Sequence, residues 1–126
     1  MRAALTVKLI LQPLVENSIY HGIRGKEGRG RIEINGYQKA DHIVLEVLDN
    51  GGGIEATRLR HINHVLAGRT SVTDASDYFG IRNVNERIKL AFGPEFGLML
   101  EQVPGGGIKA VVRLPLTSDS NGGIHL

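Results

Sequence analysis

The chain has 126 residues, 41% of them hydrophobic and 22% charged, which fits one globular domain with a single core. The formal net charge of +2 is too small, and the charges too evenly mixed along the chain, to indicate a nucleic-acid-binding surface. The absence of cysteine excludes disulfides and thiolate zinc sites, and no apolar stretch or N-terminal pattern predicts a membrane span, a membrane contact or a signal peptide.

The first part of the chain predicts a helix followed by an antiparallel hairpin. Apolar residues at helical spacing predict a helix over residues 7–23, in which Pro13 is expected to produce a kink or mark the start. Gly22 is the expected stop of this helix. Alternating apolar residues predict a strand over residues 31–38, and a nearly continuous apolar run predicts its partner over residues 43–48.

The second part predicts two helices and two further strands. Apolar spacings of three and four predict a helix over residues 55–66 and a stronger one over residues 80–92. Residues 68–77 between these helices are almost entirely polar and predict a mobile loop. Two strands are predicted over residues 98–103 and 109–114, joined by a turn that contains proline and glycine.

Helices and strands do not alternate one for one in this order, so a doubly wound parallel sheet is excluded. The predicted fold is α+β, a two-layer sandwich with three helices on one face of a mixed, mostly antiparallel sheet. Residues 1–116 are expected to form the domain, and residues 117–126 a flexible tail.

The first group of candidate functional residues lies in the first predicted helix. Residues four apart share a helix face, so Asn17 and His21 point together, as do Glu16 and Tyr20. An asparagine side-chain oxygen is a hard ligand suited to Mg²⁺, which takes few protein ligands and keeps several waters. An ordinary solvated helix face explains the same residues without any ligand.

The second group is Asp49 and the glycines that follow it, at the end of a strand predicted to be buried. A carboxylate in this position can accept a hydrogen bond from an exocyclic amine such as that of adenine, and glycines allow the backbone to approach a flat ring. A tight turn closed by the Asp49 side chain is the alternative, because Asp-Asn-Gly favours such turns.

The third group opens the strongest predicted helix, where Gly80 and Arg82 follow the polar loop. Unpaired N–H groups and the positive end of the helix dipole favour phosphate here, although any helix start after a loop has the same features. His61 and His64 are three residues apart and lack an acidic third ligand nearby, so both are expected to be surface or hydrogen-bonded residues.

Taken in this order, the three groups resemble the Bergerat ATP-binding fold shared by gyrase, a heat-shock chaperone family, MutL and histidine kinases. The closest similarity is to the LytS/YesM-like branch of the sensor histidine kinases. The resemblance covers residues 7–116 and is carried by four motifs: residues 11–22 resemble the N box, residues 49–54 the G1 box, residues 80–88 the G2 box, and residues 105–107 with 111–115 the last box and terminal strand.

This resemblance implies a site for Mg-ATP. Asn17 would hold a Mg²⁺ that bridges the phosphates, Asp49 would bond the adenine amine, and residues 68–79 would form a lid. Glu16 would assist as a base or as an orienting group. The other residues implied to contact the nucleotide line the base (Gly51, Gly53 and Ile54) or lie near the phosphates (His21, Gly80, Ile81 and Arg82).

Three positions depart from the family pattern. Tyr78 stands where the G2 box usually has a glycine, and Ile108 stands where the last box usually has a threonine near the adenine. Relatives that hydrolyse ATP have a glutamate four residues before the Asn, whereas this chain has Pro13. The last difference argues for transfer of the phosphate to another group and against autonomous hydrolysis.

The implied function is that of the cytoplasmic catalytic domain of a membrane-anchored bacterial sensor, a protein histidine kinase. Its partners would be ATP, the dimerisation and phosphoacceptor helices of the whole kinase, and indirectly a response regulator. No acceptor helix is predicted before residue 7, so the sequence is expected to be a fragment that is inactive by itself. The alternatives are an ATPase module of the gyrase or MutL type and a degenerate, non-catalytic interaction domain.

Overall fold

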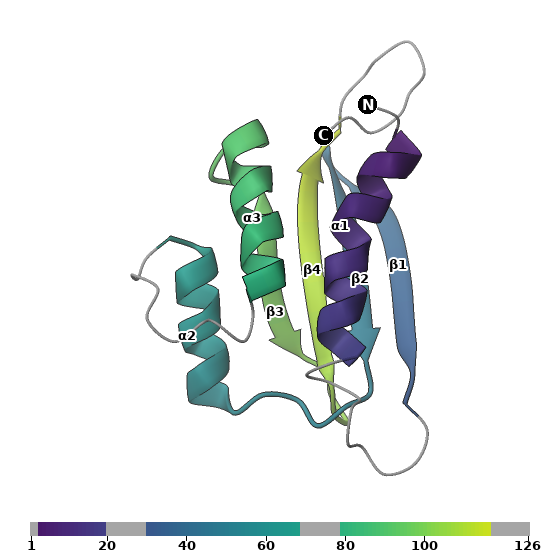
Figure 1. Ribbon diagram of the computed structural model, residues 1–126, viewed down its shortest axis with the longest axis vertical. Coiled ribbons are helices and arrows are strands. Elements are labelled where there is room, and N and C mark those ends of the chain that lie inside the picture. Colours follow the sequence, from purple (N-terminus) through teal and green to yellow (C-terminus); the bar gives the residue numbers. More distant parts are fainter. Residues whose placement is uncertain (1–2, 20–29, 69–78, 117–126) are drawn as a thin grey trace.

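The computed structural model describes residues 3–19, 30–68 and 79–116 (Figure 1). Within these ranges the chain forms three helices and four strands. In chain order they are α1 (Ala3–Asn17), β1 (Ile32–Lys39), β2 (His42–Asp49), α2 (Ala56–Leu66), α3 (Phe79–Phe92), β3 (Gly97–Gln102) and β4 (Ile108–Pro115). The predicted order of elements is confirmed.

The four strands form one sheet in the order β1-β2-β4-β3. Both predicted hairpins are present, β1 with β2 and β3 with β4, and β2 and β4 join the two hairpins at the centre of the sheet. All three pairings between these strands are antiparallel, which agrees with the expected mostly antiparallel sheet, and no parallel pair occurs among the described strands. Helices α2 and α3 connect the two hairpins, and the central strands β2 and β4 run in opposite directions where they pair.

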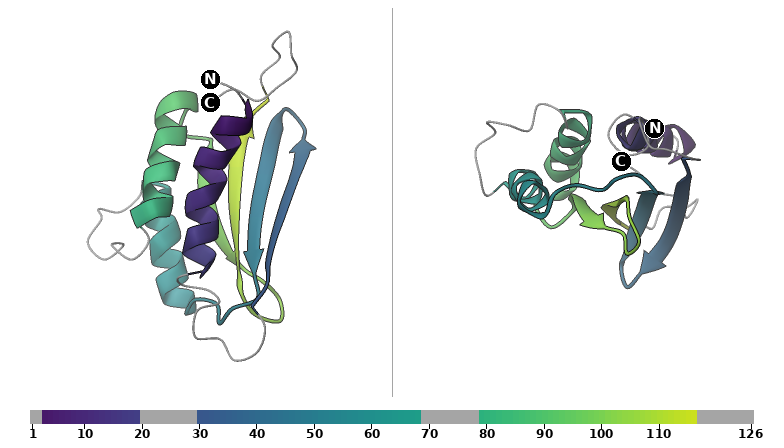
Figure 2. Two further views of the ribbon diagram at one scale, coloured as in Figure 1. Left: turned by 45° about the vertical axis from the view of Figure 1, so that its right-hand side comes forward. Right: turned by 90° about the horizontal axis from the view of Figure 1, so that it is seen from below.

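The helices cover one face of the sheet and leave the other face open, which confirms the two-layer sandwich (Figure 2). Side chains alternate across a strand, so every second residue of β2 and β4 meets the helices. The core between the layers consists of Ile10, Leu14, Leu45, Val47, Ile62, Leu66, Ile81, Val84, Ile88, Leu98, Leu100, Ile108, Ala110, Val112 and Leu114.

Helix α1 begins at Ala3, four residues earlier than predicted, and Pro13 lies inside it. Pro13 therefore does not mark the start of the helix. Leu14, the next residue, is completely buried, so packing of this face against the core supports a helix that proline alone would weaken. After Asn17 the chain makes a wider, π-type turn at residues 18 and 19, and the predicted stop at Gly22 lies outside the described residues.

Helix α2 begins one residue later than predicted because Glu55 is its N-cap. The Glu55 carboxylate accepts hydrogen bonds from the backbone N–H groups of Thr57 (3.0 Å) and Arg58 (3.1 Å). These two bonds stabilise the charged carboxylate and lower the pKa of Glu55. Of the predicted polar loop only Gly68 is described; the rest of that loop, Tyr78 and the predicted tail at 117–126 lie outside the described residues.

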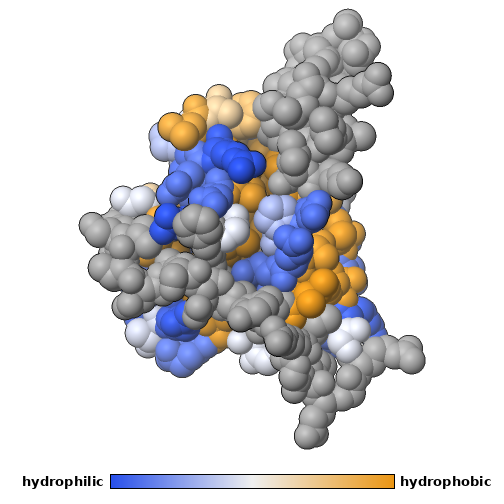
Figure 3. Space-filling model, viewed as in Figure 1, coloured by the Kyte–Doolittle hydropathy of each residue, from blue (hydrophilic) through white to orange (hydrophobic). Residues whose placement is uncertain are grey.

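The helix layer does not cover the sheet completely. Hydrophobic surface is visible at the right of the view in Figure 3, on the side of the edge strand β1. Ile34 of this strand is 51% exposed. Ile34 pairs with the fully buried Val47 and so faces the helix side of the sheet, beyond the part that α1 covers. None of the described helices has the length and hydropathy of a membrane span.

Candidate functional site

Three of the motifs meet at one end of the molecule. The C-terminal end of α1, the end of β2 and the turn between β3 and β4 all lie at the lower end of Figure 1. Helix α3 begins against α1, since a Cβ on Gly80 would lie 4.0 Å from the Cβ of Pro13. Residues far apart in the sequence are therefore neighbours, as the resemblance implied.

Asp49, the last residue of β2, is the buried carboxylate of this region, with 5% of its surface exposed. Its Oδ1 accepts two backbone hydrogen bonds, from the N–H of Gly51 at 2.9 Å and from the N–H of Ile108 at 3.3 Å. The bond to Gly51 closes the tight turn that was the alternative explanation of the Asp-Asn-Gly sequence. The turn uses only Oδ1, so it does not exclude a ligand on the second carboxylate oxygen.

The glycine loop after Asp49 is held in place from strand β3. Gly53 has a φ of +77°, and a Cβ there would lie 2.8 Å from Oε1 of Gln102. The Nε2 of the same Gln102 donates a hydrogen bond to the carbonyl oxygen of Ile54. Gly51 is buried and Ile54 is half-buried against the core. The loop is thus a fixed wall next to the carboxylate.

The candidate residues on α1 differ in exposure. Glu16 is exposed, Asn17 is half-buried and Ser18, which follows them, is only 4% exposed. Adjacent helix residues point about 100° apart, so Glu16 and Asn17 present their side chains in different directions. His21, predicted to share a helix face with Asn17, and Tyr20, predicted to share one with Glu16, lie outside the described residues.

The three candidate residues at the start of α3 differ in how much of each is exposed. Gly80 is exposed, whereas the side chain of Ile81 is completely buried in the core, which leaves only the backbone of Ile81 for a ligand. Arg82 is half-buried, and its Nε lies 3.5 Å from Oε1 of Glu86, one turn further along the helix. The N-terminal end of α3 thus combines exposed backbone with a nearby guanidinium group.

Three side-chain amides that the sequence analysis did not single out hold this architecture together. Asn63 bonds both the N–H and the carbonyl of Leu100 at 2.8 Å, and Asn85 joins α3 to β3. Asn85 continues the apolar spacing of α3, and Gln102 continues the inward-facing alternation of β3. A polar residue at a position predicted to be in the core is the sequence signal that identifies such residues.

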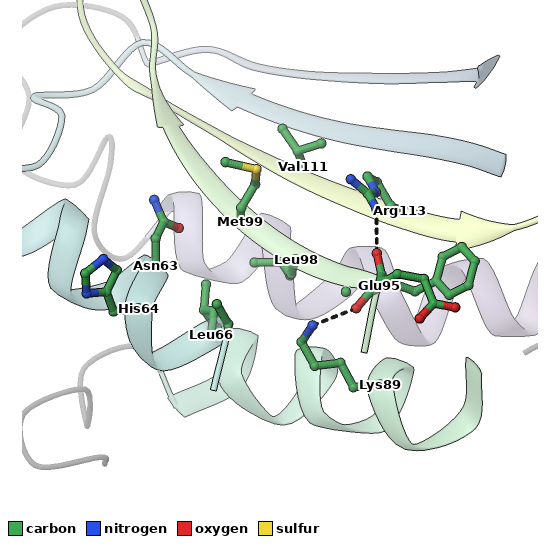
Figure 4. Close-up of a pocket in the computed structure, with 12 residues that line it drawn as sticks. Asn63, His64, Leu66, Lys89, Glu95, Leu98, Met99, Val111 and Arg113 are labelled. Carbon is green, nitrogen blue, oxygen red and sulfur yellow. Dashed lines mark hydrogen bonds between the residues drawn. The ribbon is translucent and has the colours of Figure 1, made fainter. Parts of the chain in front are cut away.

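A cavity of about 390 Å³ lies beside the edge strand β3, between that strand and helices α2 and α3 (Figure 4). Its cationic side chains bond backbone carbonyls: Lys89 Nζ donates to Pro94 and Phe96, and Arg113 Nη2 donates to Glu95. These bonds fix the turn between α3 and β3. None of the residues predicted to bind nucleotide lines this cavity, so it is separate from the site at Asp49.

The two histidines on α2 differ in burial. His64 is exposed, as expected for a surface residue. His61 is half-buried, and its Nε2 has no hydrogen-bond partner among the described residues, which differs from the expectation of a surface or hydrogen-bonded side chain.

The fold and the motifs together define a class of protein. Residues 3–118 match the family of histidine kinase-, DNA gyrase B- and HSP90-like ATPases. This match covers nearly the whole chain, and the chain therefore belongs to that family. The two-layer sandwich and the convergence of the motifs at one end of the molecule agree with this assignment.

Within the family, the chain is similar to bacterial sensor proteins. It is 30% identical to the sensor protein LytS of Bacillus anthracis over 115 residues, which is 91% of this chain and 19% of LytS. It is also 30% identical to the sensor histidine kinase BtsS of Escherichia coli over 105 residues, 83% of this chain and 16% of BtsS. A LytS of Staphylococcus epidermidis is 31% identical over 82% of the chain. The chain spans less than a fifth of the length of these curated relatives.

Proposed function

We propose that this chain is the ATP-binding catalytic domain of a two-component sensor histidine kinase. In this function it places Mg-ATP so that a histidine on another domain receives the γ-phosphoryl group. The proposal is supported by family membership and by the similarity to proteins named as sensor histidine kinases. Catalysis would consist mainly of positioning and charge neutralisation, as in other phosphoryl transfers.

The geometry of Asp49 is the main structural support for this function. A buried carboxylate that already accepts two backbone N–H groups on Oδ1 keeps Oδ2 as an acceptor. An exocyclic amine of adenine is a donor that fits this oxygen. Gly51, Gly53 and Ile54 form the adjoining loop, so we propose that they line the base.

The phosphates and the metal belong to the other half of the proposed site. Asn17 is half-buried at the end of α1, and its side-chain oxygen suits Mg²⁺, which would neutralise the phosphates when bound. The N–H groups at Gly80 and Ile81 and the guanidinium of Arg82 are proposed to bind the phosphates themselves. His21 is proposed to lie near them as well.

Two features of α1 support transfer to a histidine over hydrolysis. Pro13, which stands where hydrolysing relatives have glutamate, packs near Gly80 and carries no carboxylate that could activate a water molecule. Glu16 is exposed, so its carboxylate is accessible to a residue that approaches from another domain. We propose Glu16 as the base or orienting group for the acceptor histidine.

The partners and the location follow from the same function. The acceptor and dimerisation helices are proposed to lie elsewhere in the full-length protein, because the relatives are several times longer than this chain. The phosphohistidine would then serve a response regulator. We propose that the domain works on the cytoplasmic side of a membrane-anchored sensor, where ATP is available.

The binding function is tested with two matched aspartate variants. Asp49→Ala is expected to weaken binding of a non-hydrolysable ATP analogue in the presence of Mg²⁺ by about tenfold or more, because a charge-assisted hydrogen bond is lost. Asp41→Ala is the control, since Asp41 is exposed in the turn between β1 and β2. Isothermal titration calorimetry measures both affinities.

Equal affinity for Asp49→Ala and the wild type would remove Asp49 from the proposed site. Transfer itself is tested by adding a fragment with the acceptor helices of the full-length protein and assaying for phosphohistidine. Steady ATP hydrolysis by the domain alone, without phosphohistidine, would favour the ATPase alternative instead.

A further inference from the structure

The turn between β3 and β4 lies directly against the backbone of Asp49. The turn is closed by two hydrogen bonds, from the N–H of Val103 to the carbonyl of Gly107 at 3.0 Å and from the N–H of Gly106 to the carbonyl of Val103 at 2.9 Å. Gly107 has a φ of +102°, and a Cβ on it would overlap the carbonyl oxygen of Asp49 and lie 2.8 Å from its carbonyl carbon. Only glycine fits this crossing of two backbones.

This close approach determines which group reaches the Asp49 side chain. The residue after Gly107 is Ile108, whose N–H donates to Asp49 Oδ1 at 3.3 Å. The second donor to the same oxygen, the N–H of Gly51 at 2.9 Å, comes from the turn that directly follows Asp49. Two elements that are distant in sequence therefore fix one oxygen of the carboxylate.

The other oxygen of Asp49 has a different role. Oδ2 accepts no hydrogen bond from any residue in the described ranges, although the side chain is 95% buried. The nearby side chain of Ile108, buried with 7% of its surface exposed, has no hydrogen-bonding group of its own. Recognition of a base by hydrogen bonding beside β4 thus depends on how the carboxylate of Asp49 is oriented.

We infer that the turn between β3 and β4 sets the base preference of the site. Gly107 and the N–H of Ile108 are positioning groups: they hold Asp49 so that Oδ1 is occupied and Oδ2 selects a ligand that donates a hydrogen bond, such as a 6-aminopurine, over a 6-oxopurine. This role rests on the proposed function, in which Asp49 meets the base of the nucleotide.

The first test compares two glycines of the same turn. Gly105 and Gly107 both have positive φ, +91° and +102°, but a Cβ on Gly105 would meet nothing within 4 Å. Alanine therefore strains the backbone similarly at both positions, and only Gly107→Ala displaces Asp49. The affinities for ATP and for inosine triphosphate, each with Mg²⁺, are measured for both variants and for the wild type.

The ratio of the two affinities is the informative quantity, because a general loss of structure would weaken both nucleotides. The wild type and Gly105→Ala are expected to prefer ATP over inosine triphosphate by about 10- to 100-fold, the range for a hydrogen bond to a charged group. In folded Gly107→Ala the preference is expected to fall to within about threefold of equality.

A second variant tests the same inference without changing the turn. Asparagine at position 49 has one acceptor and one donor end. Because two backbone N–H groups point at the Oδ1 position, the amide oxygen of Asp49→Asn is expected there, and its NH₂ group then faces the ligand. This variant is expected to bind inosine triphosphate at least about tenfold more tightly than the wild type does, and to prefer it over ATP.

The outcomes separate the two proposals. If the wild type and Asp49→Ala bind ATP equally, the proposed function of the site fails. If Asp49→Ala loses affinity but folded Gly107→Ala keeps the wild-type ratio, or Asp49→Asn gains nothing for inosine triphosphate, only the role of the turn is overturned. If Gly107→Ala does not fold, the result with Asp49→Asn decides.

Discussion

Asn85 is a buried residue of α3 whose side chain bonds two other elements of the fold. It is 2% exposed and uses both ends of its amide: Nδ2 donates to the carbonyl of Leu66 at 2.7 Å, and Oδ1 accepts from the N–H of Leu98 at 2.9 Å. The side chain thereby joins the end of α2 to the edge strand β3. A buried amide with both ends bonded stabilises its neighbours mainly by preventing unpaired buried groups.

Asn85→Ala is expected to destabilise the domain by about 2–4 kcal/mol, because it leaves a buried N–H and a buried carbonyl without partners. Urea unfolding followed by circular dichroism measures this loss. Arg87→Ala, an exposed change on the same helix, is the control and is expected to stay within about 0.5 kcal/mol of the wild type. A similar small effect for Asn85→Ala would mean that water replaces both bonds.

At the scale of single residues, the sequence identified Asp49 but left its role open between a turn and a ligand. The structure shows that Oδ1 forms the turn, while Oδ2 remains as an acceptor. The second donor to Oδ1 is Ile108, which is 59 residues away in the chain. Local sequence statistics cannot predict a bond between residues so distant.

The sheet has a charged network on the face away from the helices. Tyr37 donates its hydroxyl to Glu46 at 3.0 Å, and Lys109 Nζ lies 3.7 Å from Glu46 and 3.5 Å from Glu101. The Glu101 carboxylate, followed by that of Glu46, raises the pKa of Lys109, while the hydrogen bond to Glu46 raises the pKa of Tyr37. The network spans all four strands.

These raised pKa values predict how the sheet responds to alkali. A group whose pKa is higher in the folded than in the unfolded state stabilises the fold below its unfolded pKa, near 10.5 for Lys109, and this contribution is lost as pH rises through the folded value. As pH rises above about 10.5, the wild type is therefore expected to lose stability more steeply than Lys109→Met.

Urea midpoints at several pH values check this expectation. Lys39→Met is the matched control, because Lys39 is exposed at the end of β1 and its removal is expected to keep the wild-type slope. Identical slopes for the wild type and Lys109→Met would show that the network contributes nothing measurable, as is common for exposed ion pairs.

At the scale of elements, periodicity predicted most boundaries well. Helix α3 was predicted over residues 80–92 and spans Phe79–Phe92, since its apolar stripe and its Gly-Pro ending are both strong local signals. Helix α1 was predicted from residue 7, where its apolar spacing begins, but it starts four residues earlier, at Ala3. Its buried face, with Leu14 at 0% exposure, shows that packing outweighs the cost of an internal proline here.

At the scale of the whole molecule, α1 is the element that connects the candidate site to the core. Leu14, one residue after Pro13, packs among the side chains of both layers. Leu14→Ala is expected to cost about 2–5 kcal/mol, because it leaves a cavity at a completely buried position. Leu90→Ala, at 88% exposure on α3, is expected to cost less than about 0.5 kcal/mol.

Thermal and urea unfolding of the two leucine variants test whether α1 belongs to the cooperative unit. A loss below about 1 kcal/mol for Leu14→Ala would mean that α1 can detach while the sheet and the other helices remain folded. A large loss with a single transition would confirm that the candidate site is built on the same core as the sheet.

The sequence by itself determined the elements, their order, the α+β class and the family resemblance, because periodicity and motif spacing are local properties. It also proposed the candidate nucleotide contacts, which remain predictions. The tertiary structure alone decided that the two hairpins join in an antiparallel sheet, that Gly107 passes the backbone of Asp49, and that Asn63, Asn85 and Gln102 bond distant backbone groups. These features depend on contacts between residues that are far apart in the chain, and such contacts exist only after the core has packed.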